Sequence, residues 1–188
     1  MRAPGLILAM LGAVALESGA ARQDRRPRAD LTPRVETAPA RPGKGARLSL
    51  LVELPAGIHV QAHDPRDPTL IPTTLTLETP DGVRVTEIVY PPPSELAQTG
   101  RPEKLMVLGP KFTIDVRLDL VAGVPPGDVP VRGRLRYQAC NDTVCFPPAT
   151  AAVVWTMHVG SALHRSRPPA PRRHDALRVC PRLSATRR

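Results

Sequence analysis

The sequence predicts an all-β fold, an antiparallel sandwich of about seven strands. Short runs alternate apolar and polar residues, and turn-forming residues separate these runs. The chain contains 24 prolines and only 3% aromatic residues, a composition that favours a loop-rich β domain over a helical one. Once the first 20 residues are set aside, no long stretch carries an apolar stripe at helical period.

The clearest predicted strand covers residues 111–120, where every second residue is apolar. Phe112, Ile114 and Val116 share one face with two leucines, and charged or hydroxyl side chains occupy the other face. Asp81-Gly82 predicts a hairpin turn between two further strands. The strands expected in addition are residues 46–54, 58–62, 73–79, 83–90, 131–138 and 150–159, with a short one at 105–108.

Four segments are predicted along the chain. Residues 1–21 are typical of a secretory signal peptide, because a charged start precedes a short apolar run and small residues for cleavage. That run is shorter than the about 20 residues a membrane span needs. Residues 22–45 are expected to form a flexible leader and residues 161–188 a disordered basic tail, since neither shows periodicity. The sandwich domain is therefore expected at residues 46–160, exported to an oxidising compartment.

The positive charge lies outside the expected domain. The whole chain carries a net +9, but residues 46–160 hold ten Lys/Arg and twelve Asp/Glu, so the domain is nearly neutral. The sequence has no helix with clustered Lys/Arg and no aromatic stacking platform, which argues against nucleic-acid binding. A weaker hypothesis is that the basic tails bind anionic surfaces without specificity.

Two cysteines, Cys140 and Cys145, lie in the loop between the last two predicted strands. Asn141-Asp142 supplies turn chemistry, and Pro147-Pro148 interrupts strand pairing because proline lacks an N–H. The neck of such a hairpin can supply the Cα separation that a disulfide requires. If the two cysteines bond, the ring of six residues contributes only about 2 kcal/mol to stability. A bridge that adds so little to stability is a plausible reactive one.

The same stretch carries a family resemblance. Tyr137-Gln138-Ala139-Cys140 followed by Cys145-Phe146-Pro147-Pro148 resembles the active-site hairpin of the N-terminal periplasmic domain of DsbD, the thiol:disulfide interchange protein. Residues 59–73 also resemble that family, and the similarity covers residues 46–159. The resemblance implies an immunoglobulin-like fold and protein-disulfide reductase chemistry without a cofactor, in the periplasm.

The resemblance also implies roles and partners. Cys145 would bond to partner proteins, and Cys140 would resolve the mixed disulfide. The electron donor would be the thioredoxin-like domain of a membrane electron transporter. The acceptor would be a periplasmic disulfide isomerase or a thioredoxin-like protein of cytochrome c maturation. No histidine or lysine adjoins either cysteine in the sequence, so partner docking is expected to supply much of the thiol activation.

Four residues flank the cysteines: Tyr137, Gln138, Phe146 and Pro147. Tyr137 is expected to fill the core, and Phe146 to cover part of the disulfide. In the family a cap loop shields the cysteines, and the matching region here is residues 91–105. An alternative from another class is a non-catalytic immunoglobulin-like binding or structural domain with an inert disulfide.

A second cluster of polar residues precedes the predicted strand at 73–79. His59, His63, Asp64 and Asp67 are of metal-ligand types, but Pro65 and Pro68 exclude the helix that the four-residue histidine spacing suits. We therefore expect a hydrogen-bonded loop and no metal.

The odd cysteine is Cys180 in the tail, and it is either a free thiol or an intermolecular link.

Overall fold

The computed structural model describes residues 26–98 and 100–161, and this part of the chain is all-β. It contains no helix long and apolar enough to cross a membrane. The expected signal peptide, most of the basic tail and Cys180 lie outside the described residues. The strands are β1 (Asp30–Val35), β2 (Gly45–Glu53), β3 (His59–Gln61), β4 (Thr74–Glu78), β5 (Val83–Val89), β6 (Ser94–Leu96), β7 (Leu105–Leu108), β8 (Lys111–Leu120), β9 (Gly127–Tyr137), β10 (Ala139–Cys140) and β11 (Ala149–Val159).

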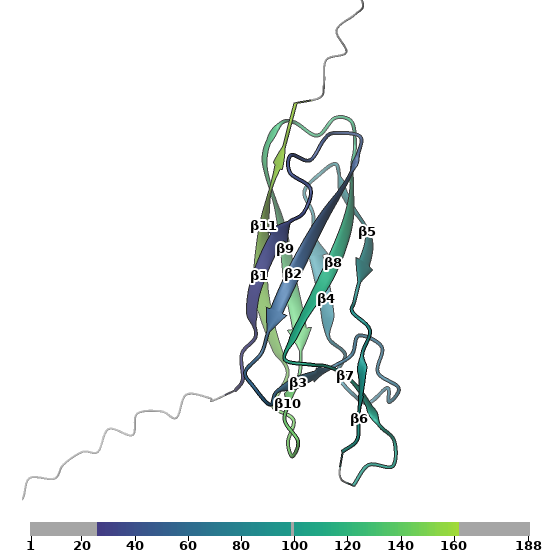
Figure 1. Cartoon of the computed structure of the whole chain (residues 1–188). Coiled ribbons are helices and arrows are strands. Elements are labelled where there is room, and N and C mark those ends of the chain that lie inside the picture. The colour runs from purple at the N-terminus through teal and green to yellow at the C-terminus, as the bar shows by residue number, and fades with distance from the viewer. Residues whose placement is uncertain (1–25, 99, 162–188) are drawn as a thin grey trace, which may run out of the picture.

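Two sheets of long strands form the sandwich, and a third, smaller sheet lies at one end (Figure 1). The long sheets have the orders β1-β2-β8-β5 and β11-β9-β4. The small sheet has the order β10-β3-β7-β6, and every strand pair in the three sheets is antiparallel. The predicted all-β antiparallel sandwich is confirmed.

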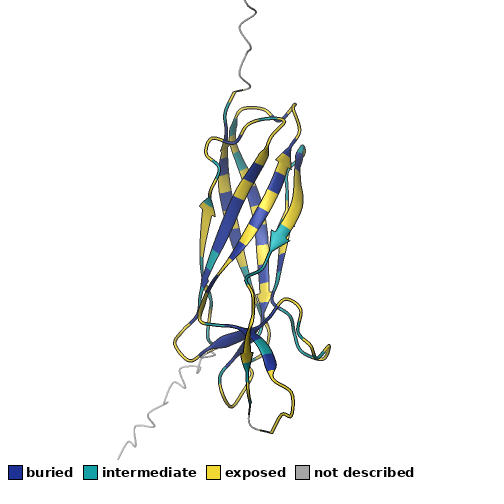
Figure 2. Cartoon of the chain, turned by 45° about the vertical axis from the view of Figure 1, so that its right-hand side comes forward, coloured by how far each residue is buried: buried dark blue, intermediate teal, exposed yellow. Residues whose placement is uncertain are grey.

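Alternation along the long strands builds the core. Figure 2 shows buried and exposed residues alternating along them, and β8 does so over its full length. Trp155 of β11 is almost fully buried, and its indole N–H donates to the carbonyl oxygen of Ser49 in β2 at 2.8 Å. This bond joins the two long sheets and satisfies the one polar atom of the largest core side chain.

Within the predicted flexible leader at residues 22–45, the structure corrects the expectation from residue 30 onwards. Residues 30–35 form β1, which pairs with β2 over six positions, and Ala40 is fully buried. β1 is an edge strand with only two partly buried side chains, Leu31 and Val35, so its apolar pattern is weak. Pro33 reads as a strand breaker in sequence, yet an edge strand tolerates it.

Gly133 in β9 provides the space that the Trp155 ring occupies. A Cβ at position 133 would lie 2.9 Å from Trp155 Cζ3, 3.0 Å from Leu77 Cδ2 and 3.1 Å from Val153 Cγ1. The first distance is shorter than real Cβ contacts allow and the other two are tighter than most of them, and the neighbours belong to strands on both sides of β9. The sheet therefore requires glycine here for packing.

We expect Gly133→Ala to lower the free energy of unfolding by about 1–3 kcal/mol, because the methyl group overpacks the core around Trp155. Urea unfolding followed by the fluorescence of this single tryptophan measures the change. Gly123→Ala is the matched control, because a Cβ there meets nothing within 4 Å. Equal stability of the two variants would contradict this account of the packing.

Candidate functional site: a disulfide hairpin

The hairpin at the lower end of the molecule in Figure 1 carries the disulfide. Cys140 and Cys145 are bonded, with Cα atoms 4.0 Å apart, and they face each other across an antiparallel bridge. The N–H of Phe146 donates to the carbonyl of Ala139, and the N–H of Asn141 to that of Val144, both at 2.9 Å. The cysteines thus form a non-hydrogen-bonded pair, the position where opposed residues approach most closely in an antiparallel ladder.

Asn141 fixes the turn that holds the two cysteines opposite each other. Its Oδ1 accepts hydrogen bonds from the Thr143 N–H at 2.9 Å, the Thr143 hydroxyl at 3.0 Å and the Val144 N–H at 2.8 Å. The asparagine side chain replaces a backbone acceptor in the tip, as in an Asx turn. The turn is therefore specified locally, by one residue between the cysteines.

The two sulfur-bearing residues differ in exposure. Cys140 is 0% exposed, because β10 lies between β3 and the returning strand of the hairpin. Cys145 is exposed, and its neighbour Val144 is 49% exposed. A partner protein can therefore contact Cys145, whereas Cys140 has no exposed surface to contact.

The four predicted flanking residues surround the base of the hairpin. Tyr137 is buried in the core as expected, and its hydroxyl accepts a hydrogen bond from the Ala29 N–H at 2.8 Å. Gln138 donates through Nε2 to the carbonyl of Phe146 at 3.0 Å. The Phe146 side chain is half-buried against the core, and Pro147 is exposed. The Gln138 side chain thus joins the two sides of the hairpin neck, and Tyr137 joins the start of the hairpin to the segment before β1.

The neighbour of Cys140 in space is a residue that the sequence did not place there. β3 pairs with β10 so that His59 lies directly opposite Cys140. His59 is 8% exposed, and its Nε2 has no hydrogen-bond partner. Gln61, two residues on along β3, is fully buried with both amide atoms unpaired. No histidine is adjacent to either cysteine along the chain, but in the folded protein His59 lies next to Cys140.

Burial lowers the pKa of His59 below its ordinary value of 6.5. The nearby Asp142 carboxylate partly opposes this shift. The imidazole is therefore neutral at pH 7 and able to accept a proton. No signal in the sequence pairs residue 59 with residue 140, because they are distant in the chain and join only through strand register.

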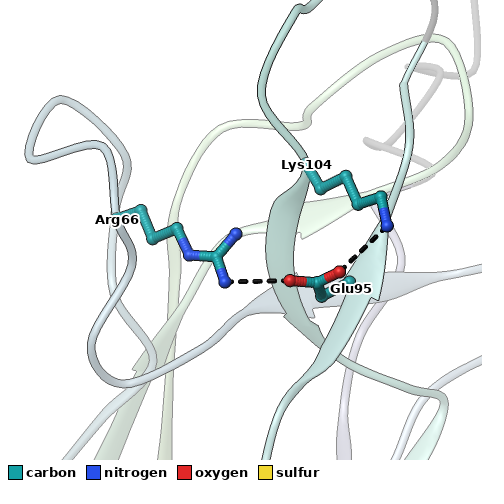
Figure 3. A network of polar contacts seen from close by, with 3 residues as sticks. All are labelled: Arg66, Glu95 and Lys104. Atoms are coloured by element: carbon teal, nitrogen blue, oxygen red, sulfur yellow. Dashed lines mark hydrogen bonds and ion pairs between the residues drawn. The ribbon is translucent and has the colours of Figure 1, made fainter.

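Residues 91–105, where the resemblance predicts a cap loop, contain β6 and end at the first residue of β7. In the sheet order β10-β3-β7-β6, two strands separate this region from Cys140, and Cys145 is exposed. The segment is tied to the neighbouring loop by Glu95, which accepts from Arg66 at 2.9 Å and from Lys104 at 3.0 Å (Figure 3). These two bonds lower the pKa of Glu95.

The second polar cluster divides between separate local contacts. His63 Nδ1 donates to the carbonyl of Thr73 at 3.0 Å, and its ring stacks on Tyr90 with centroids 3.9 Å apart. Asp67 accepts from the backbone and hydroxyl of Thr69. Within the described ranges, no group of three or more His, Cys, Asp or Glu side chains is arranged to hold a metal ion.

A β-sandwich with a disulfide hairpin, one cysteine exposed and the other buried, defines a class of protein suited to thiol–disulfide exchange. The sequence matches the family described as thiol:disulfide interchange protein DsbD, N-terminal, over residues 29–156. The chain therefore belongs to this family, and its domain is a thiol–disulfide interchange domain. The match begins at residue 29, just before β1, in agreement with the correction made to the leader.

The similarity to solved structures is lower than the family match, with identities of 13% or less and TM-scores below 0.5 for the three described next. The reduced N-terminal domain of DsbD from Neisseria meningitidis is 13% identical with a TM-score of 0.40, covering 68% of this chain and 86% of that one. The N-terminal periplasmic domain of ScsB from Proteus mirabilis is 13% identical with a TM-score of 0.47, covering 67% and 45%. The GAE domain of GGA2p from Saccharomyces cerevisiae is 7% identical with a TM-score of 0.39, covering 69% and 88%. No curated protein sequence matches significantly. The family assignment rests on the sequence match.

We expect Asn141→Ala to make the disulfide easier to reduce. Without the Oδ1 acceptor, the reduced hairpin holds its thiols less often in the bonding arrangement. A net loss of about 1 kcal/mol raises the reduction potential by about 20 mV. Equilibration with glutathione measures the potential, and Asn141→Asp, which keeps the acceptor, should stay near the original value. A potential unchanged in Asn141→Ala would show that the turn does not preorganise the pair.

We expect the oxidised protein to lose stability as the pH falls below 6.5. In that range the unfolded chain protonates His59 while the folded protein does not, so the free energy of unfolding rises with pH and levels off above this window. Urea unfolding between about pH 5 and pH 8 measures this. His59→Gln should lack this part of the dependence and the exposed-site control His158→Gln should keep it; identical curves for all three proteins would refute the assignment.

Proposed function

We propose that this domain relays electrons between extracytoplasmic proteins through reversible reduction of the Cys140–Cys145 disulfide. The observation that carries the proposal is the difference in exposure between the two residues, with Cys145 open to solvent and Cys140 buried. A purely structural bridge gains nothing from presenting one sulfur at an exposed hairpin tip. An exchange site requires one attackable sulfur and one protected resolving sulfur.

In the reductive step, a donor thiolate attacks the Cys145 sulfur. The Cys140–Cys145 bond breaks, its electron pair goes to the Cys140 sulfur, and a donor–Cys145 mixed disulfide forms. The second thiol of the donor then attacks this mixed disulfide. The donor leaves as a disulfide, and the domain becomes a dithiol after taking up protons.

In the oxidative step, the Cys145 thiolate attacks the disulfide of an acceptor. Cys140 then attacks the Cys145 sulfur, which restores the Cys140–Cys145 bond and releases the acceptor as a dithiol. Two electrons thus pass from donor to acceptor in each cycle. The buried position of Cys140 supports its role as resolving residue, because the sulfur it can attack is the one on Cys145 of its own hairpin.

The proposed donor is a thioredoxin-like domain of a membrane electron transporter. The proposed acceptors are a periplasmic disulfide isomerase or a thioredoxin-like protein of cytochrome c maturation. Family membership supports a thiol–disulfide transfer pathway and an extracytoplasmic location. The exposed apolar residues at the tip, including Val144, Cys145 and Pro147, offer such partners a small contact surface.

We expect Cys140→Ala to trap partner proteins as stable mixed disulfides on Cys145, because the resolving sulfur is gone. Purification from an oxidised periplasmic extract, followed by release with dithiothreitol and mass spectrometry, identifies them. Cys145→Ala is the matched control and should trap few or none, since Cys140 is buried. Equal trapping by both variants would overturn the assigned roles.

The reduction potential separates the relay from an inert structural disulfide. We expect a value above about −300 mV, because structural bridges lie below that level. Equilibration of the full chain with glutathione or dithiothreitol buffers, read by thiol alkylation, gives the potential. A value well below that level would favour a non-catalytic binding or structural domain.

A further inference from the structure

Three buried polar atoms on one face of β3 have no hydrogen-bond partner: His59 Nε2, and Oε1 and Nε2 of Gln61. Buried polar side chains are nearly always satisfied, so such a group in a native fold calls for an explanation. Both residues point to the same face of their strand, since they are two positions apart. Figure 2 shows this end of the molecule, where β3 is buried along its whole length.

The sulfur of Cys140 belongs to the same face. Cys140 and His59 are register partners, and side chains of directly opposed residues have Cβ atoms about 4.5–5.5 Å apart. While the disulfide is intact, this sulfur has no proton to donate. After reduction it becomes a thiol or thiolate, buried and in need of a partner.

We propose that His59 is the proton acceptor and donor of the Cys140 thiol during exchange, with Gln61 as a polar neighbour. This inference deepens the relay proposed above and rests on it. The unpaired Nε2 of the oxidised protein is the group that accepts the S–H proton once the disulfide opens.

The proton moves with each half of the cycle. When Cys140 attacks the Cys145 mixed disulfide, its S–H proton passes to His59 Nε2, the sulfur–sulfur bond forms, and the partner leaves as a thiolate that takes a proton from the imidazolium or from water. When a donor opens the disulfide, the electron pair goes to the Cys140 sulfur and a proton returns to it through His59. The neutral form of His59 dominates at pH 7, which suits it to accept the proton of Cys140; in the reductive half the ring first takes up a proton from water and then passes it to the Cys140 sulfur.

Few other groups compete for this role. On β10 the only titratable side chain is that of Cys140, and in the turn the Asp142 carboxylate interacts with His59. The strand on the other side, β7, consists of Leu105, Met106, Val107 and Leu108 and carries no titratable group. Among the described strands β3, β7 and β10, the imidazole of His59 is therefore the base that lies directly opposite the buried sulfur, and Asp142 belongs to the exposed turn.

The test follows the resolving step alone. The reduced full-length protein is mixed with excess oxidised glutathione, quenched with acid at set times, and analysed by mass spectrometry for the glutathione adduct on Cys145 and its loss. The measurement is repeated between about pH 5 and pH 9.

In the unaltered protein we expect the rate of adduct loss to rise as His59 becomes neutral and to level off by pH 7. In His59→Gln, which keeps a polar group of similar reach but cannot take up a proton, we expect a rate about tenfold lower at pH 7. That rate should then climb with thiol ionisation near pH 8.5, where the difference shrinks. His158→Gln should match the unaltered protein.

Two results would overturn the role of His59 alone: an unchanged pH profile in His59→Gln, or a rate reduced equally at every pH, which marks a structural effect. If the unaltered protein forms no adduct or never releases it, the relay itself fails and this role fails with it. Should His59→Gln not fold, the test is a pH titration of the unaltered protein labelled with nitrogen-15, which gives the pKa of His59 in the oxidised and reduced states. Reduction should shift the pKa of His59, and the absence of a shift would refute the proposal.

Discussion

The chemistry of this domain depends on one constraint, the antiparallel register that places Cys140 between Cys145 and His59. The turn fixed by Asn141 sets one side of that register, and the pairing of β10 with β3 sets the other. A shift of one residue would move the side chains to the opposite face and separate both pairs. The reactive geometry is therefore a property of backbone pairing, and no long-range charge arrangement is needed to create it.

The exposure difference follows from the same constraint. β10 pairs with β3 on one side and meets the returning segment of the hairpin through a single bridge on the other, whereas that returning segment carries Cys145 at the outer edge of the hairpin. The two prolines after Phe146 lack the N–H groups that further ladder bonds need. Local sequence thus keeps one sulfur exposed while the sheet encloses the other.

The sequence alone was sufficient for the elements with strong patterns. The alternation in β8 and the turn residues between strands predicted the sandwich, and the cysteine motif predicted the site. β1 was missed because an edge strand buries only two side chains and contains Pro33. His59 was missed as a neighbour of Cys140 because contacts between distant strands depend on register, which local patterns do not encode.

One hydrogen bond made near the amino-terminal end of the domain matters for how the domain is isolated. The Ala29 N–H donates to the Tyr137 hydroxyl, and Tyr137 is the last residue of β9, three positions before the buried cysteine. A version trimmed to start at residue 46, where the sequence pattern predicts the start of the domain, would lack β1, leave the edge of β2 unpaired and remove the hydrogen bond to Tyr137. The disulfide reactivity of such a shortened protein would be that of a hairpin without its normal support, so β1 should be kept in every assay.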